Sequence, residues 1–269
     1  GQSVLYKVCG NDCCARTSSS SWYLFAYIRV NDAASSKNYV NYSSISRCVN
    51  ERTDSYYIIV LGYGKICCPS VNNSMNKCYR YSGIYCYPYS DSSSVICSMS
   101  YSSFTDNIAS NDICIYFNKE NSKYEIKCCN ILRNSQVSSS NGIIYVPGNT
   151  MIEDSCILEN TANYIFYVYS SSTLTLTLSN CTVDKTSYYG SFKTQNTVTK
   201  SFIHGLNHMS TQNCHSEYDS AGYLTAIPYT SHPTKKVICY TFNHCQARIS
   251  DIFSLTWVLL VVFIHPNPS

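Results

Sequence analysis

The chain repeats one short stretch at a nearly constant interval: "SSFTDN" at 102–107, "CNILRN" at 129–134, "SCILEN" at 155–160 and "NCTVDK" at 180–185. Aligned without gaps, these stretches begin 27, 26 and 25 residues apart. Two looser copies, "RCVNER" at 47–52 and "KCYRYS" at 77–82, extend the series upstream. A fixed period of this length is typical of proteins built from stacked structural repeats.

Short segments rich in β-branched and aromatic residues lie between the copies, and helix signals are nearly absent. These segments are "SYYIIVLG" (55–62), "DICIYF" (112–117), "GIIYV" (142–146), "YIFYV" (164–168) and "TLTLTL" (173–178). The strict hexad of a left-handed β-helix and the Leu/Asn pattern of leucine-rich repeats are both absent. We therefore predict an all-β chain that folds as a right-handed parallel β-helix, a solenoid of roughly six coils of about 25 residues.

The repeat divides the chain into four parts. We expect an N-terminal cap at 1–40, β-helix coils at 41–200, and coils or a second cap containing His and Cys at 201–250. The apolar residues at 251–269 are expected to form a terminal strand, and truncation of this strand at the end of the sequence is left open. The apolar run itself, 252–264, is shorter than the roughly 20 residues that a membrane helix needs. A buried strand is favoured, and a truncated or interfacial membrane anchor is the alternative.

Stacked coils place equivalent side chains about 4.8 Å apart. Asn107, Asn134 and Asn160 are therefore expected to form a structural ladder, in which each amide bonds the next. Asparagine also tolerates the left-handed conformation that tight turns need.

The position before each asparagine carries a charge, with Asp106, Arg133 and Glu159 alternating in sign. Exposed pairs of this kind contribute about 0–1 kcal/mol, so they help specify register more than stability. Cys156 and Cys181 are expected to stack as well, at a separation within the range of about 4.4–6.8 Å between disulfide-bonded Cα atoms. A buried cysteine stack is favoured, and a disulfide is the alternative.

Polarity in this chain comes from uncharged side chains. Only 13% of the 269 residues are charged and the net charge is +3, whereas 45% are hydrophobic. This composition excludes a coiled coil or long helical bundle, which needs about half Ala, Glu, Lys, Leu and Arg. It also argues against a disordered chain, and it offers no basic surface for nucleic acid.

Cysteine and tyrosine are unusually frequent, with 17 and 26 copies. Disulfides of a secreted protein and buried thiols both fit the cysteine count. Tyrosines along the strands are suited to stacking on sugars or to flat contacts with protein, although most are expected to be half-buried sheet residues.

A search for catalytic chemistry leaves one pair of carboxylates. Glycoside hydrolysis needs two carboxyl groups about 5–9.5 Å apart, and Glu159 and Asp184 are expected on neighbouring coils. Their positions belong to the turn ladder, so a structural role is favoured over a catalytic one. His204 and His208, with Cys214 and His215, match no standard zinc spacing, so no metal site or cofactor is predicted.

The coils "IKCCNILRN" (126–134), "IEDSCILEN" (152–160) and "LTLTLSNCTVDK" (174–185) resemble the pectin-lyase-like right-handed β-helix superfamily. With the tail "CYTFNHCQARISDIFSL" (239–255), the Cys-, Asn- and Tyr-rich coils also look like repeat surface proteins of trichomonad parasites. The coil resemblance covers about 140 residues and the tail about 20 more, and the resemblance carries no lyase active site over to this chain.

The resemblance implies a secreted or membrane-anchored surface protein, extracellular or at the cell surface, that takes part in adhesion. Its expected partners are a carbohydrate or a host-surface protein, with membrane anchoring through sequence missing at the C-terminus. The alternative is a degenerate polysaccharide lyase or glycoside hydrolase that uses Glu159 and Asp184.

Overall fold

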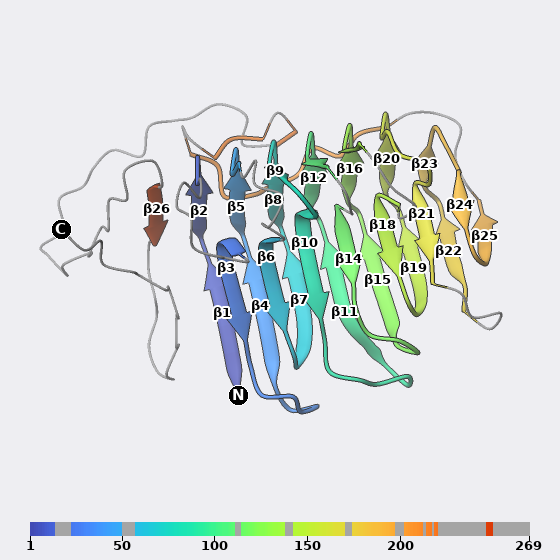
Figure 1. Cartoon of the computed structure of the whole chain (residues 1–269), viewed down its shortest axis with the longest axis horizontal. Helices are drawn as coiled ribbons and strands as arrows, with labels where there is room; N and C mark the ends of the chain where they lie inside the picture. The colour runs from blue at the N-terminus through green and yellow to red at the C-terminus, as the bar shows by residue number, and fades with distance from the viewer. Residues whose placement is uncertain are drawn as a thin grey trace, which may run out of the picture.

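The computed structural model is all-β, and its strands stack into a parallel β-helix (Figure 1). This confirms the fold class predicted from the repeat. No helix occurs in the part of the chain that the structure describes. That part comprises residues 1–13, 23–49, 57–110, 114–137, 142–169, 174–196, 202–211, 214–216, 218–219 and 246–249.

The predicted terminal strand at 251–269 lies outside the described residues, and so does most of the tail at 239–255.

Each coil supplies one strand to each of three long sheets. Sheet A contains β1 (Gln2–Tyr6), β4 (Lys37–Asn41), β7 (Lys65–Pro69), β11 (Val95–Ser100), β15 (Lys123–Lys127), β19 (Asn149–Glu153), β22 (Leu176–Ser179) and β25 (Phe192–Gln195). Sheet B, the next along each coil, contains β2 (Val8–Asn11), β5 (Ser43–Ser46), β8 (Val71–Ser74), β12 (Ser103–Thr105), β16 (Asn130–Leu132), β20 (Cys156–Leu158) and β23 (Thr182–Val183). At the edge of sheet B, β26 (Gln246–Ile249) pairs antiparallel with β2.

Sheet D closes each coil. It contains β3 (Tyr23–Arg29), β6 (Tyr57–Gly62), β10 (Tyr81–Tyr87), β14 (Ile115–Phe117), β18 (Ile144–Val146), β21 (Phe166–Val168) and β24 (Tyr188–Tyr189). Between sheets B and D, a short sheet C contains β9 (Lys77–Cys78), β13 (Ile108–Ala109) and β17 (Ser135–Gln136). The first coil begins at β1, within the stretch that the sequence suggested as a cap.

The strand register gives the coil length directly. Successive partners in sheet B are Ser44, Asn72, Ser103, Asn130, Cys156 and Thr182, in steps of 28, 31, 27, 26 and 26 residues. The coils are therefore slightly longer than predicted, and the earlier ones are less regular in length.

Aliphatic and aromatic rows fill the interior. On sheet D, register partners that face inward form a continuous buried row of Ile59, Ile84, Ile115, Ile144 and Phe166. Buried side chains of sheet A face this row, as the alternation of buried and exposed residues in β15 shows. Burial of apolar surface contributes roughly 25 cal/mol per Å², and it is the main source of stability of the stack.

A ladder of buried asparagines lines one corner of the solenoid. The Asn107 Nδ2 donates to Asn134 Oδ1 at 3.0 Å, and the Asn134 Nδ2 donates to Asn160 Oδ1 at 3.0 Å. The same oxygens accept the backbone N–H groups of Asn107 and Asn134, at 3.1 and 2.9 Å. Asn76, which the repeat alignment missed, extends the row, because its backbone N–H donates to Asn107 Oδ1 at 3.1 Å.

Each of these amides also bonds the backbone of the coil below. The Asn134 Nδ2 donates to the Phe104 carbonyl and the Asn160 Nδ2 to the Ile131 carbonyl, both at 2.8 Å. Backbone groups buried at a corner cannot reach water and need such partners. The ladder therefore supplies hydrogen bonds where the sheets are interrupted.

The left-handed residues of these corners are the ones before the asparagines. Asp106, Arg133 and Glu159 have φ angles of 57°, 53° and 59°. The sequence interpretation gave this conformation to the asparagines themselves, so it was displaced by one residue. An L-residue adopts this conformation at a cost of roughly 1–2 kcal/mol, which the hydrogen bonds of the following asparagine help to offset.

A segment that we call the strap, residues 202–219, runs back along the outer face of sheet B (Figure 1). The His204 carbonyl accepts from Asn130 Nδ2 at 2.9 Å, and the His204 N–H donates to Asn130 Oδ1 at 3.1 Å. Further toward the first coil, the Ser44 hydroxyl donates to the Met209 carbonyl. The strap belongs to the 201–250 region, and its described part covers the side of the solenoid.

A disulfide fastens the strap to the first coil. Cys9 on β2 is bonded to Cys214, with 6.0 Å between their Cα atoms. The bond joins residues 205 positions apart in the sequence.

Replacing Asn134 by Ala is expected to lower the free energy of unfolding by about 3 kcal/mol, because the Asn107 N–H and the Phe104 carbonyl lose buried partners. Urea unfolding followed by circular dichroism measures this change. Asn149→Ala is the control, since exposed Asn149 accepts only the Thr175 N–H, at 2.9 Å, and should lose less than about 1 kcal/mol. Equal losses in the two variants would contradict the role of the ladder.

Candidate functional site: the tyrosine face of sheet D

A row of stacked tyrosines, the tyrosine ladder, covers the outer face of sheet D. Its members are register partners on five successive strands: Tyr85, Tyr116, Tyr145, Tyr167 and Tyr189. Each follows from the alternation of a strand. On β14, for example, Ile115 and Phe117 point inward and are buried, so Tyr116 between them points outward.

The rings of the ladder lie nearly parallel. Neighbouring ring centroids are 4.4–5.4 Å apart, and the ring planes differ by 6–12°. Aromatic pairs of this geometry contribute about 0.5–1.5 kcal/mol each beyond the surface that they bury. The ladder thus stabilises the coil stack and also offers a continuous aromatic surface.

Burial in the stack keeps the tyrosine hydroxyls protonated. It raises the pKa of Tyr145 to about 12 and raises the pKa values of Tyr85, Tyr116 and Tyr167 above the ordinary tyrosine value. At neutral pH each hydroxyl therefore remains able both to donate and to accept a hydrogen bond.

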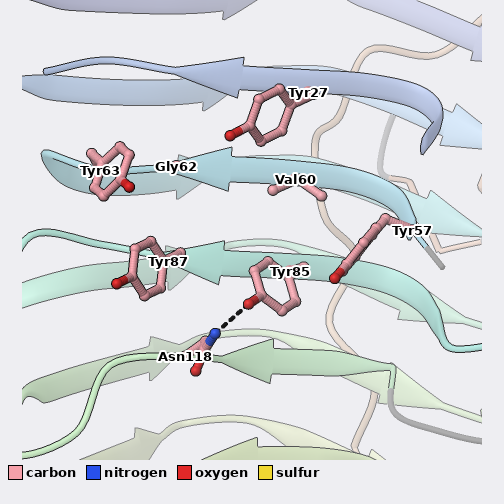
Figure 2. A pocket seen from close by; sticks show the side chains of 8 residues that line it. All are labelled: Tyr27, Tyr57, Val60, Gly62, Tyr63, Tyr85, Tyr87 and Asn118. Atoms are coloured by element: carbon pink, nitrogen blue, oxygen red, sulfur yellow. Dashed lines mark hydrogen bonds between the residues drawn. The ribbon is translucent and has the colours of Figure 1, made fainter. Parts of the chain in front are cut away.

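The aromatic row is interrupted on β6. The register continues from Tyr85 to Val60 and then to Tyr27, so a valine stands where the neighbouring strands carry tyrosine. Val60 is only 4% exposed. The missing ring leaves a pocket of about 350 Å³, with Val60 at its floor and Tyr27 and Tyr85 on either side (Figure 2).

A second small residue lengthens this gap. Gly62 lies in register between Arg29 and Tyr87, where the neighbours again have large side chains. A Cβ atom at Gly62 would lie 3.6 Å from the Arg29 Cγ, so the arginine stem passes directly beside this glycine. The pocket is consequently two side-chain positions long.

Aromatic rings and one amide close the pocket. Tyr57 lies at one end, with its ring edge-on to Tyr85 at 4.9 Å, and Tyr63 and Tyr87 lie at the other end, 5.2 Å apart (Figure 2). The Asn118 Nδ2 donates to the Tyr85 hydroxyl. The described lining therefore combines aromatic faces with polar groups and contains no acidic residue.

Two cations lie at the Tyr63 end. The Arg29 guanidinium is 4.4 Å from the Tyr63 ring centroid and donates to the Tyr63 hydroxyl at 3.1 Å. The Lys119 Nζ is 5.1 Å from the Tyr87 ring centroid. No ion pair to either cation is present among the described residues.

The predicted catalytic pair lies on an exposed corner away from this face. The Asp184 carboxylate accepts the backbone N–H of Glu159 at 2.6 Å. This contact gives the Asp184 carboxylate a structural role, because it accepts a backbone hydrogen bond in the turn.

The charged positions around Arg133 form a defined ion pair. The Arg133 guanidinium binds the Asp106 carboxylate through two hydrogen bonds of 2.8 and 2.7 Å and donates to the Tyr218 hydroxyl of the strap at 2.6 Å. Arg133 therefore connects two coils and the strap.

Cys156 and Cys181 are both buried thiols on neighbouring coils, but they occupy different columns. The register pairs Cys156 with Thr182, one residue beyond the gapless alignment. The Cys156 thiol donates to the Phe202 carbonyl of the strap, whereas the Cys181 thiol donates to the Ile152 carbonyl at 3.4 Å. A shift of one residue in a strand reverses the side to which the side chain points.

Most of the described cysteines are thiols with little exposure. Burial raises the pKa values of Cys114 and Cys129 to about 12, and those of the neighbouring Cys68, Cys86 and Cys97 are also raised. A raised pKa leaves little thiolate, which is the nucleophilic form.

The strap brings a serine, a histidine and a carboxylate together beneath it. The Ser103 Oγ lies 2.9 Å from His208 Nε2, and Asp219 Oδ1 lies 3.5 Å from the same nitrogen. A hydrolase triad has the carboxylate on the opposite ring nitrogen, whereas His208 Nδ1 has no hydrogen-bond partner in the described structure. All three side chains are buried, so the arrangement is not suited to nucleophilic catalysis.

Burial keeps this pair uncharged. It lowers the pKa of His208 to about 4 and raises the pKa of Asp219 to about 7. Between these pH values both groups are neutral in the folded protein.

Two further properties concern the described residues alone. They contain no group of three or more His, Cys, Asp or Glu side chains placed to hold a metal ion. They also contain no helix of the length and apolarity needed to cross a bilayer.

Comparison with known proteins gives no match to a family model, to a curated protein or to a solved structure.

Asp219→Asn is expected to gain stability relative to the parent protein as pH rises from about 4 to about 7. Over this range folded Asp219 retains a proton that the unfolded chain, with a pKa of about 3.9, has released, so the parent loses stability with rising pH. His208 is present in both proteins, and its titration cancels in the difference. Urea unfolding at several pH values measures the effect, and a constant difference would contradict it.

Native protein treated with iodoacetamide at pH 8 is expected to react only at the half-buried thiols among the described cysteines, Cys67 and Cys128. Peptide mass spectrometry identifies the labelled sites, and the same reaction in urea should reach the buried thiols. Labelling of Cys68 or Cys86 as fast as Cys67 in the folded protein would show that iodoacetamide reaches the interior, and it would contradict the burial of these thiols.

Proposed function

We propose that this chain is a non-enzymatic carbohydrate-binding protein and that the tyrosine face of sheet D is its contact surface. The observation that carries the proposal is the tyrosine ladder, whose ring faces repeat once per coil. A flat aromatic surface with hydroxyl groups at its rim suits sugar rings, because their C–H faces pack on aromatic rings and their hydroxyls bond polar groups.

Two features favour a saccharide over a nucleic acid, which can also stack on aromatic rings. Nucleic-acid binding needs a basic groove that follows the phosphates, and the net charge of this chain is only +3. The five ladder strands carry no Lys or Arg, and the cations placed on tyrosine rings of the pocket are Arg29 on β3 and Lys119, just after β14.

The polysaccharide-active alternative receives less support. Its best pair is Glu159 and Asp184, and the Asp184 carboxylate is engaged by the Glu159 N–H. Neither residue lies on the tyrosine face, so a sugar bound there would not reach them.

An extracellular or cell-surface location is part of the proposal. It is supported by the Cys9–Cys214 disulfide, because disulfides persist in oxidising compartments. Kinship with the pectin-lyase-like superfamily and with the trichomonad surface proteins, and membrane anchoring through further sequence, are proposed on the resemblance of the coils and tail. Adhesion to a glycan on another surface is the corresponding role.

The test is binding of the protein to an array of immobilised saccharides. Saccharides that bind the parent should bind the double variant Tyr145→Ala/Tyr167→Ala at least about tenfold more weakly, because two stacking faces are lost. Tyr6→Ala/Tyr101→Ala is the matched control, since these exposed tyrosines lie outside sheet D. Circular dichroism checks that both double variants are folded.

Absence of binding to every saccharide on the array would overturn the proposal. Equal losses in the two double variants would remove its assignment to the tyrosine face.

A further inference from the structure

The gap in the tyrosine row has the dimensions of one missing ring. Tyr27 and Tyr85 flank it from strands that are two steps apart, or about 9.6 Å. Intact neighbours in the ladder are spaced at 4.4–5.4 Å, so the span between the two strands corresponds to one intervening ring. A ligand ring can therefore complete the row.

The gap is a consequence of sequence, since the fold does not require it. Every described strand of the row from β10 to β24 has tyrosine at this position, and β6 alone among the pocket strands has valine. From Ile59 to Gly62 the backbone of β6 pairs in continuous register with β10 on one side and with β3 on the other, and the register shifts of both pairings lie before this stretch. A tyrosine could thus occupy position 60 without altering the register.

The two ends of the pocket differ in charge. Tyr63 and Tyr87 lie at the same end of the pocket (Figure 2). The Arg29 guanidinium lies over the Tyr63 ring and the Lys119 Nζ over the Tyr87 ring. The described lining offers no carboxylate to neutralise them. The opposite end, at Tyr57, is aromatic.

We propose that this pocket is an anchoring subsite for one ring of an anionic saccharide, with the ring between Tyr27 and Tyr85 and its carboxylate or sulfate group toward Arg29 and Lys119. The inference rests on the proposed function, and it adds that the saccharide bound in this pocket is anionic. A volume of about 350 Å³ is at the lower end of the usual range for small-molecule sites, about 300–1,000 Å³. That volume favours a single ring over a longer ligand segment.

Polar groups at the rim suit a sugar better than an aromatic side chain of a protein. The Tyr63 hydroxyl and the Asn118 amide can each bond a ring hydroxyl, and the Arg29 guanidinium can bond the anionic group. An aromatic side chain entering the gap would add no hydrogen bond to the ones these groups already make with Tyr85 and Tyr63.

The decisive variant is Val60→Tyr, which fills the gap with the residue that the ladder has on its other strands. It should keep the fold and lower the affinity for an anionic disaccharide at least about tenfold, because the ligand ring and the new side chain occupy the same space. Thr177→Tyr is the control, since it adds a tyrosine to the outer face of sheet A. Isothermal titration with three probes measures the effect: a sulfated disaccharide, a uronate-containing disaccharide and a neutral disaccharide.

Arg29→Gln tests the charge separately. It should lower the affinity for the anionic probes about tenfold and leave the weaker neutral probe unchanged, and added salt should reduce the same difference. Lys123→Gln, which removes a cation from sheet A, is its control. Comparison of the sulfated and uronate probes shows which anionic group the subsite prefers.

The outcomes separate this inference from the proposed function. Saccharide binding that depends on Tyr145 and Tyr167 but survives Val60→Tyr unchanged would overturn the subsite and leave the proposed function standing. Equal binding of neutral and anionic probes would overturn the charge assignment, and binding of an aromatic peptide in place of every saccharide would overturn the subsite as well. Loss of all saccharide binding in the parent would overturn both.

Discussion

The hydrogen bond between equivalent residues on neighbouring coils is the interaction on which this structure depends. Parallel strands supply it along the sheets, and the asparagine ladder supplies it at a corner where the sheets stop. Asn134 shows the requirement most clearly, because its side chain bonds the asparagine above, the asparagine below and a backbone carbonyl. A residue without an amide group could not make these contacts, which explains why the corner returns to asparagine despite variation in the length of the coils.

The same stacking rule has opposite consequences inside and outside the coil. Inside, equal spacing of side chains gives a dry core of aliphatic residues and thiols. Outside, it forces tyrosines on sheet D into contact at the distance that suits aromatic rings. A surface row of this kind needs no dedicated loop or cleft, because the backbone already provides its spacing. Function and stability are consequently coupled at the ladder, whereas a substitution at Val60 alters the surface without removing a ring.

Sequence reasoning recovered the parts of the fold that repeat. The gapless alignment identified Asn107, Asn134 and Asn160 as equivalent, and the register places them in one column. It missed Asn76, because the step from Asn72 to Ser103 is longer than the others. It also paired Cys156 with Cys181, because the gapless alignment steps by 25 residues there, whereas the strand register steps by 26 and pairs Cys156 with Thr182.

The candidate site was harder to predict because it is defined by a departure from the repeat. Alternation alone gives outward tyrosines on β10 and β14, yet the pocket exists where Val60 and Gly62 interrupt that pattern. Alignment of "VLG" at 60–62 with "YCY" at 85–87 could have revealed the gap, but only after the register was known. The strap contains no repeat at all, and its contacts with sheet B depend on tertiary packing.

The disulfide between Cys9 and Cys214 also determines how the molecule would carry a mechanical load. Tension that enters from residues beyond Cys214 reaches the first coil through a covalent bond, so it bypasses the later coils. The pocket on β6 lies only a short way along the stack from that bond, and the sheet hydrogen bonds between them would be stretched along the stacking direction. A load applied at this end of the stack would therefore leave the distal coils wound.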